Sequence, residues 1–153
     1  MATVSLCMIV KNEEKVLGRC LDCAKEIADE IIIVDTGSSD GTKEIASNYT
    51  DQIYDYEWKD DFASARNFAF SKASMDYCMW LDADDVIQES EQKKINELKK
   101  QLTPADSAVM MKYVTAFDDR GKPAFLFDRE RLLRREDGYL WSGRVHEAIT
   151  VRG

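Results

Sequence analysis

Hydrophobic residues occur along this 153-residue chain in short continuous runs that alternate with amphipathic stretches. Apolar residues dominate the runs at 3–10, 30–35 and 77–81, which is typical of strands covered on both faces by helices. The stretches at 13–28 and 62–73 instead place apolar residues at helical spacing. This alternation predicts an α/β fold with a Rossmann-like, mainly parallel sheet and helices on both faces.

Shorter patterns complete the first half of the chain. We expect a helix at 43–49 and a more polar strand at 52–56, which would lie near the edge of the sheet. Asn12 is a candidate N-cap for the first helix, which should open at 11–14. A charged surface helix is expected at 89–101, with a thin apolar stripe, and Pro104 ends it.

The pattern changes after residue 104. Apolar runs at 107–114 and 125–133 flank a polar turn at 118–123, which predicts an antiparallel pair of strands. We expect a loop at 136–147 and the beginning of one more strand at 148–151. The length suits a single domain (1–153) with a β-rich second half (104–153) after a first half at 1–103.

Composition narrows the class of protein. The chain has 29 acidic and 21 basic residues and a net charge of −8, which argues against a non-specific nucleic-acid binder. No apolar run approaches the length of a membrane span, and the first residues lack the features of a signal peptide. We therefore expect a cytoplasmic protein, in which the four cysteines are small buried thiols.

Three carboxylates follow the apolar run at 77–81 within four residues: Asp82, Asp84 and Asp85. Acids at the carboxyl end of a buried strand lie where α/β sheets bind ligands. Such closely spaced carboxylates repel one another unless a cation compensates, and hard oxygen ligands suit Mg²⁺ or Mn²⁺. A metal that carries phosphates is the simplest occupant. The alternative is a solvated turn in which Asp85 or Ser90 caps a helix.

Asp35 ends another predicted central strand, and the small residues after it allow a ligand to approach the backbone. Its carboxylate can accept a hydrogen bond from a base N–H or a ribose hydroxyl. We expect Asp35 and Asp82 to end neighbouring strands, so that both acids face the same crevice. The alternative is a residue that only holds the turn. The segment 34–39 also looks like the active-site loop of aspartic proteases, but helices flank it and no second copy exists.

Four segments together resemble the family 2 glycosyltransferases of the GT-A fold, in order and at similar spacing. They are Val10-Lys11-Asn12-Glu13-Glu14, Val34-Asp35-Thr36-Gly37-Ser38-Ser39-Asp40-Gly41-Thr42, Ala65-Arg66-Asn67 and Trp80-Leu81-Asp82-Ala83-Asp84-Asp85. The resemblance implies a nucleotide-sugar donor, most often a UDP-sugar, with a divalent metal bridging the diphosphate.

The resemblance also implies roles for residues of the first half. Val10, Lys11, Glu13 and Asp35 would line the uridine pocket. Arg66 would contact the base or a phosphate, whereas without the resemblance a surface salt bridge to Asp60 or Asp61 would be the simpler interpretation.

In the same family pattern, Asp82 would lie towards the ribose and the metal's waters, and Asp84 would be the direct metal ligand. The segment at 141–147 looks like the Trp-X-Gly-X-Val-His-Glu segment of a subset of these enzymes. By this resemblance Glu147 is a candidate general base, and His146 is a candidate third metal ligand or phosphate contact. Trp141 would either stack on a sugar or fill the core.

The expected reaction is Mn²⁺- or Mg²⁺-dependent transfer of a sugar, with inversion, from a UDP-sugar to a hydroxyl or thiol of a glycan, peptide or lipid-linked sugar. Two alternatives stay open. One is a non-catalytic nucleotide-sugar-binding domain; the other is a sugar nucleotidyltransferase, although the segment at 11–14 is too acidic for its phosphate loop. Family members usually continue into acceptor-binding helices, so the resemblance implies a truncated or minimal donor-binding core, with a further C-terminal helical region in a full-length protein.

Overall fold

A six-stranded mixed sheet organises the chain, in the strand order β3-β2-β1-β4-β6-β5. The computed structural model describes residues 2–58, 61–103, 106, 108–117, 123–142 and 148–151, and the side chains of these residues except 110–130, 140, 142 and 148–151. Its first half contains β1 (Val4–Val10), α1 (Leu17–Ala24), β2 (Glu30–Asp35), α2 (Thr42–Ser47), β3 (Ile53–Asp55), α3 (Phe62–Ser71), β4 (Tyr77–Trp80) and α4 (Glu89–Gln101). The second half contains β5 (Ala108–Phe117), β6 (Pro123–Arg134), a 3-10 turn (Arg135–Asp137), β7 (Tyr139–Ser142) and β8 (Ala148–Val151).

The predicted fold class is confirmed. Strands β3, β2, β1 and β4 run parallel to one another, and β3 lies at the edge as expected. Strands β6 and β5 then continue the sheet in antiparallel pairing. Of the polar turn predicted at 118–123, residues 118–122 lie outside the described residues, and Pro123 begins β6.

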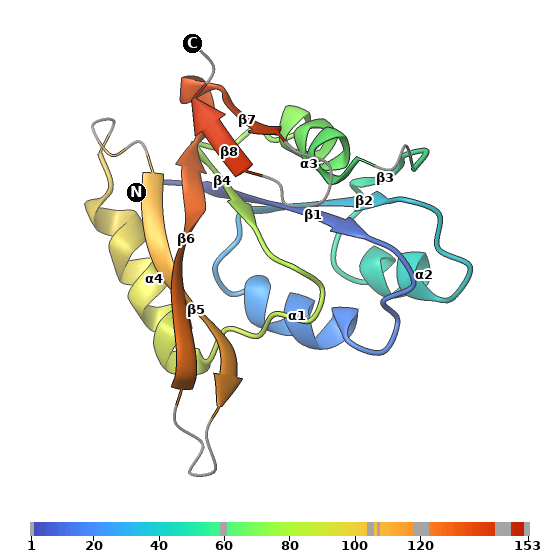
Figure 1. Cartoon of the computed structure of the whole chain (residues 1–153), viewed down its shortest axis with the longest axis horizontal. Coiled ribbons are helices and arrows are strands. Elements are labelled where there is room, and N and C mark those ends of the chain that lie inside the picture. The colour runs from blue at the N-terminus through green and yellow to red at the C-terminus, as the bar shows by residue number, and fades with distance from the viewer. Residues whose placement is uncertain are drawn as a thin grey trace.

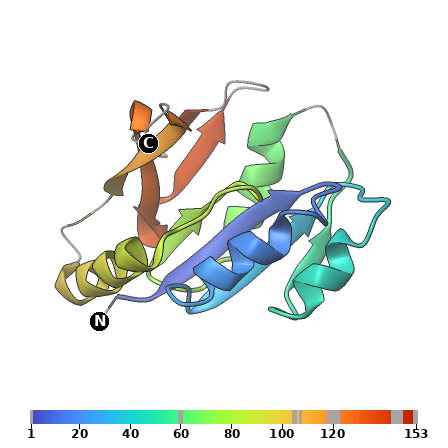
Figure 2. The same ribbon diagram turned by 90° about the horizontal axis from the view of Figure 1, so that it is seen from below.

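Helices cover both faces of the sheet, as Figures 1 and 2 show. Helices α1, α2 and α4 lie on one face, and α3 lies on the other beside the small β7–β8 ribbon. Because successive side chains of a strand point to opposite faces, β1 sends Leu6 and Met8 into the first core and Cys7 into the second, beside Ala69 of α3. All four cysteines are free. No helix within the described ranges is long and apolar enough to cross a bilayer.

The start of the first helix was predicted wrongly. Helix α1 begins at Leu17, and Asn12 does not cap it but adopts a left-handed conformation (φ 53°). The Asn12 side chain accepts a hydrogen bond from the Ser39 N–H at 2.7 Å, and the Asn12 N–H donates to the Ser38 hydroxyl at 2.9 Å. Asparagine tolerates this backbone conformation and bonds locally, so the residue ties the loop after β1 to the loop after β2.

Two further expectations need correction. Asp35 and Asp82 do not end neighbouring strands, because β1 lies between β2 and β4. The segment expected as a loop at 136–147 contains β7, which pairs antiparallel with the expected strand β8. A strand of four residues shows little alternation of its own, and its pairing with β8, which follows it closely in the chain, stabilises it.

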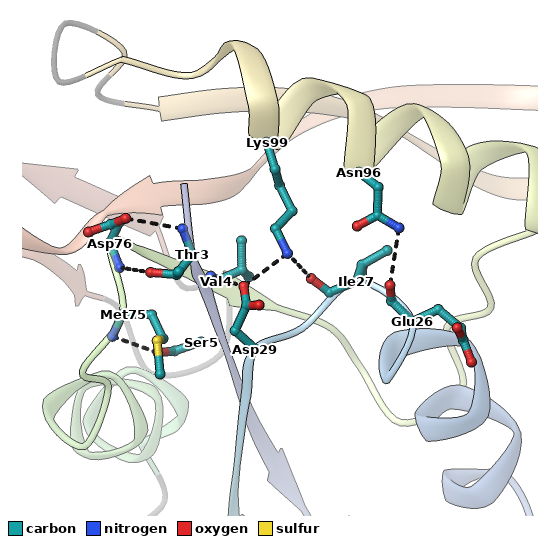
Figure 3. A network of polar contacts seen from close by, with 10 residues as sticks. All are labelled: Thr3, Val4, Ser5, Glu26, Ile27, Asp29, Met75, Asp76, Asn96 and Lys99. Atoms are coloured by element: carbon teal, nitrogen blue, oxygen red, sulfur yellow. Dashed lines mark hydrogen bonds and ion pairs between the residues drawn. The ribbon is translucent and has the colours of Figure 1, made fainter. Parts of the chain in front are cut away.

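At the opposite end of the sheet from the acid turn, α4 is anchored by a buried lysine (Figure 3). The ammonium of Lys99, whose side chain is 5% exposed, donates to the Ile27 carbonyl at 2.7 Å and to the Asp29 carboxylate at 2.9 Å. The same Asp29 oxygen accepts from the Val4 N–H at 2.8 Å. Lys99 thus joins α4 to the beginnings of β1 and β2.

Candidate functional site

A pocket of about 330 Å³ opens at the carboxyl ends of β1 and β2 and beside the turn that follows β4. It brings together six of the residues predicted for a site: Val10, Lys11, Glu13, Arg66, Asp82 and Asp84. Ligand sites of parallel α/β sheets lie at this end of the strands. The fold therefore gathers residues that are up to 74 positions apart in sequence.

The acids after β4 form a tight turn. The Asp85 N–H donates to the Asp82 carbonyl at 2.9 Å, and the Asp85 carboxylate accepts from the Asp82 N–H at 2.8 Å. Helix α4 begins only at Glu89, after Gln88, so neither Asp85 nor Ser90 is its cap. The alternative of a plain capping turn is therefore wrong.

Asp85 is turned inward, and Asp84 is exposed. Burial raises the pKa of the Asp85 carboxyl, and the Asp82 N–H and the guanidinium of Arg131 offset part of this rise. Arg131 donates to Asp85 at 3.2 Å and to the Trp80 carbonyl at 3.0 Å. Arg131 was not predicted as a site residue, because most residues around it in the chain are charged and only its burial distinguishes it.

Arg66 is 7% exposed and lies inside the site rather than on the surface. Its guanidinium donates to Asp82 at 3.0 Å and lies 4.9 Å from the ring centres of both Trp80 and Trp141. Asp61 instead caps α3 by accepting from the Ser64 N–H, and Asp60 lies outside the described residues. The interpretation of Arg66 as a surface salt bridge is therefore wrong.

Asp35 uses one carboxylate oxygen to hold the loop after β2. Its Oδ1 accepts from the Gly37 N–H at 2.9 Å and from the Ser38 N–H at 2.7 Å, and Gly37 has the positive φ of 117° that favours glycine. Its Oδ2 is buried and has no hydrogen-bond partner among the described residues. A buried carboxylate oxygen without a donor is costly, so a donor is expected at this position. Asp35 itself is not among the residues that line the pocket, although its neighbour Thr36 is.

Charge in the pocket favours a cation. Burial raises the pKa of the Glu13 carboxyl, and the carboxylates of Asp84, Asp40 and Asp82 raise it further. No group of three or more metal-ligating side chains occurs among the described residues. Asp82 and Asp84 nevertheless fit Mg²⁺ or Mn²⁺, because such ions are often held by one or two carboxylates together with substrate phosphates.

Trp141, from the second half of the chain, belongs to the core and does not line the pocket. It is 3% exposed and packs edge-on against Trp80 at 5.2 Å between ring centres. Its backbone N–H donates to the Asn67 side chain at 2.7 Å, and its carbonyl accepts from the same side chain at 2.9 Å. His146 and Glu147 lie outside the described residues.

Two aromatic residues of the pocket were not predicted as site residues. Phe62, one of the apolar residues at helical spacing in the stretch 62–73, is 38% exposed and lines the pocket with Trp58. Their ring centres are 4.8 Å apart. An aromatic residue at the first position of a helix gives no sequence signal that separates a pocket wall from a core contact.

Comparison with known proteins gives a consistent result. The family model "Glycosyl transferase family 2" matches residues 5–149. The chain is 31% identical to the lipopolysaccharide core biosynthesis glycosyltransferase LpsC of Rhizobium meliloti over 161 aligned positions. This alignment covers 98% of this chain and 58% of LpsC. It is 47% identical over 85 residues to a TPR repeat-containing protein of Synechococcus elongatus, and these residues cover 56% of this chain and 21% of that protein.

Among solved structures, that of S. aureus TarS residues 1–349 shares the fold, with a TM-score of 0.55 at 22% identity over 65% of this chain and 32% of TarS. The chain thus spans between about a fifth and three fifths of the length of these relatives. The match over nearly all of its residues shows that the chain belongs to glycosyl transferase family 2.

Proposed function

We propose that the pocket binds the nucleoside diphosphate of a UDP-sugar and that the protein transfers the sugar to an acceptor, with inversion, in a metal-dependent reaction. The main support is the convergence of Arg66, Asp82 and Asp84 on one pocket at the carboxyl ends of the parallel strands of a family 2 glycosyltransferase. TarS, which shares the fold, has been crystallised with UDP and with UDP-GlcNAc.

The nucleoside would lie over the ends of β1 and β2. Asp35 Oδ2, which lacks a partner among the described residues, would accept the imide N–H of uracil. Val10, Lys11 and Glu13 would form the wall of this part of the pocket. The bonds from Gly37 and Ser38 to Oδ1 fix the carboxylate, so that little side-chain entropy is lost when the base binds.

The diphosphate would lie on the β4 side of β1, near Asp82 and Asp84. These two carboxylates would hold Mg²⁺ or Mn²⁺, which as a Lewis acid stabilises the negative charge on a departing diphosphate. The ion pair with Arg66 fixes one oxygen of Asp82, which is 42% exposed at its side chain and so still accessible from the pocket. Arg66 itself would supply positive charge close to a phosphate.

The acceptor side is proposed from the family resemblance. Glu147 would act as general base towards an acceptor hydroxyl or thiol, and His146 would contact the metal or a phosphate. Glycans, peptides and lipid-linked sugars are the candidate acceptors. A single donor-binding and acceptor-side unit over 1–153 and a cytoplasmic location stay predictions.

Calorimetry with UDP, in the presence and absence of Mn²⁺, tests the donor site. Wild-type protein should bind UDP more tightly with Mn²⁺. The Asp84→Asn variant should lose this gain, by a factor of about 10 or more, because the substituted amide removes a charged metal ligand. An Asp51→Asn variant, which changes an exposed aspartate away from the pocket, should behave like the wild type.

Equal UDP affinity with and without Mn²⁺, or an unchanged Mn²⁺ gain in the Asp84→Asn variant, would contradict the metal site. A panel of UDP-sugars and acceptors then separates the alternatives. Transferred sugar supports a transferase. Tight binding of a UDP-sugar with neither transfer nor UDP release supports the non-catalytic binding domain.

A further inference from the structure

Arg131 lies in β6, in the second half of the chain, yet its guanidinium reaches the acid turn that follows β4. We propose that Arg131 is a positioning residue for the diphosphate and metal subsite, and that it acts by fixing the backbone of the turn through Asp85 and the Trp80 carbonyl. This role depends on the proposed donor site.

The contacts of Arg131 converge on both ends of the turn. Its Nη1 donates to the carbonyl of Trp80, the last residue of β4, at 3.0 Å. The same nitrogen donates to Asp85 Oδ2 at 3.2 Å, and that oxygen also accepts from the Asp82 N–H at 2.8 Å. The guanidinium carbon lies 4.0 Å from the ring centre of Trp80. One cation therefore connects the end of the strand, the first residue of the turn and its last residue.

Burial makes this contact set rigid. The side chain of Arg131 is 7% exposed, and that of Asp85 is 14% exposed. A buried ion pair with several hydrogen bonds has little freedom, and loss of one partner leaves the other charge uncompensated. By contrast, Asp84 is exposed, and Asp82 is 42% exposed at its side chain. Arg131 thus holds the inward acid, and the two acids beside it are presented to the pocket.

Arg66 and Arg131 contact different parts of the acid turn. Arg66 bonds the side chain of Asp82, whereas Arg131 fixes the backbone through Asp85 and Trp80. The nucleoside part of the site depends on neither contact, because Asp35 is held by the loop after β2 on the other side of β1. Removal of Arg131 should therefore weaken the metal-diphosphate interaction and spare nucleoside binding.

The experiment compares Arg131→Met, Arg131→Lys and a control, Arg134→Met. Arg134 lies at the end of the same strand and is also paired with an aspartate, Asp137, but does not touch the turn. Binding of UDP with Mn²⁺ is measured by calorimetry, and binding of uridine by ligand-observed NMR. In Arg131→Met the dissociation constant for UDP with Mn²⁺ should rise by about 10-fold or more, as for other residues that orient metal ligands.

Uridine affinity should change less than about 2-fold in every variant, which corresponds to about 0.4 kcal/mol. The reason is that the loop after β2, and not Arg131, holds Asp35. Arg131→Lys should lie between Arg131→Met and the wild type, since an ammonium keeps the charge but not the planar stack on Trp80. Arg134→Met should bind both ligands like the wild type.

A double variant, Arg131→Met with Asp85→Asn, keeps the test decisive if Arg131→Met alone is unstable. It removes the unpaired buried charge, so the fold should recover. The inference requires that UDP–Mn²⁺ affinity stays weakened in this variant while uridine affinity is normal. Recovery of UDP–Mn²⁺ affinity to the wild-type value would show that Arg131 only neutralises Asp85 and would overturn the inference. If wild-type protein shows no Mn²⁺ gain at all, the proposed metal site itself fails, and the role of Arg131 fails with it.

Discussion

The two carboxylate oxygens of Asp35 differ in their contacts, and the proposed donor site gives the second oxygen a ligand. Oδ1 satisfies two N–H groups of the loop after β2, and Oδ2 is buried without a donor among the described residues. From the sequence, a turn role and a ligand role for Asp35 were alternatives. The two roles are compatible, because the turn uses Oδ1 and leaves Oδ2 without a donor among the described residues.

An Asp35→Asn substitution should change the preferred base. The amide oxygen can keep the bonds from Gly37 and Ser38, so the NH₂ group takes the place of Oδ2. That donor would then face the imide N–H of uracil, and UDP affinity should fall by about 10- to 100-fold, which corresponds to about 1.4–2.8 kcal/mol. Cytosine offers an acceptor at the same ring position, so CDP should gain relative to UDP. Calorimetry with both nucleotides measures this shift.

Asp55→Asn is the matched control. Asp55 is the register partner of Asp35 on β3, but its side chain is 74% exposed and pairs with Lys43. Unchanged UDP and CDP affinities are expected there. An Asp35→Asn variant that keeps the wild-type preference for UDP over CDP would show that Oδ2 does not receive the base.

Motifs identify residues better than they identify environments. The resemblance to family 2 placed Arg66, Asp82 and Asp84 at one site, and the structure brings them into one pocket. The burial of Arg66 between two tryptophans did not follow, because one of them, Trp141, is 75 residues away in the chain. Arg131 was missed for the same reason: a charged residue in a charged segment is distinguished only by the tertiary contacts that bury it.

At the scale of elements, apolar spacing predicted most helices and strands. Helix α4 has the bounds expected from its charged pattern, and β3 lies at the edge that its polarity suggested. The pattern read α4 as a surface helix, with Ile95 and Leu98 in its apolar stripe. It did not show that Lys99, next to that stripe, is buried, because a lysine at such a position usually extends to solvent.

Lys99→Met should destabilise the fold by about 2 kcal/mol. Methionine can fill the space of the alkyl chain, but the Ile27 carbonyl and the Asp29 carboxylate lose a charged donor. Asp29 is 38% exposed and regains some hydration, so the loss should fall below that of a fully buried pair. Urea unfolding, followed by circular dichroism, measures the free energy of unfolding.

The adjacent residue provides the control for this prediction. Lys100 also belongs to α4 and pairs with Glu97, but both side chains are more than half exposed. Lys100→Met should change the free energy of unfolding by no more than about 0.5 kcal/mol. Equal effects of the two substitutions would show that the contacts of Lys99 in Figure 3 do not stabilise the fold.

At the scale of the whole molecule, the two halves of the chain share one sheet. Strand β6 pairs antiparallel with β4, so that Met79 lies opposite Leu132 in the middle of the sheet. A hydrophobic cluster adds residues from both halves: Ala63, Trp80, Leu133 and Trp141. The sequence predicted the antiparallel strands but not their position beside β4. Strand order depends on pairing between segments that are more than 50 residues apart, which no local pattern encodes.

This shared sheet predicts a single cooperative unfolding transition. Far-UV circular dichroism mainly follows helices α1 to α4 of the first half. Tryptophan fluorescence follows Trp58, Trp80 and Trp141, and the last two meet where the halves join. If β6 and β7 separated first, the environment of Trp141 would change before the helices melt. Because Arg131 and Asn67 add polar contacts across the same boundary, partial opening would leave buried charges and backbone groups unpaired. The two signals should therefore give coincident urea midpoints. A fluorescence midpoint clearly below that of circular dichroism would mean that the second half is only loosely attached, and that the Arg131 contact is not maintained in solution.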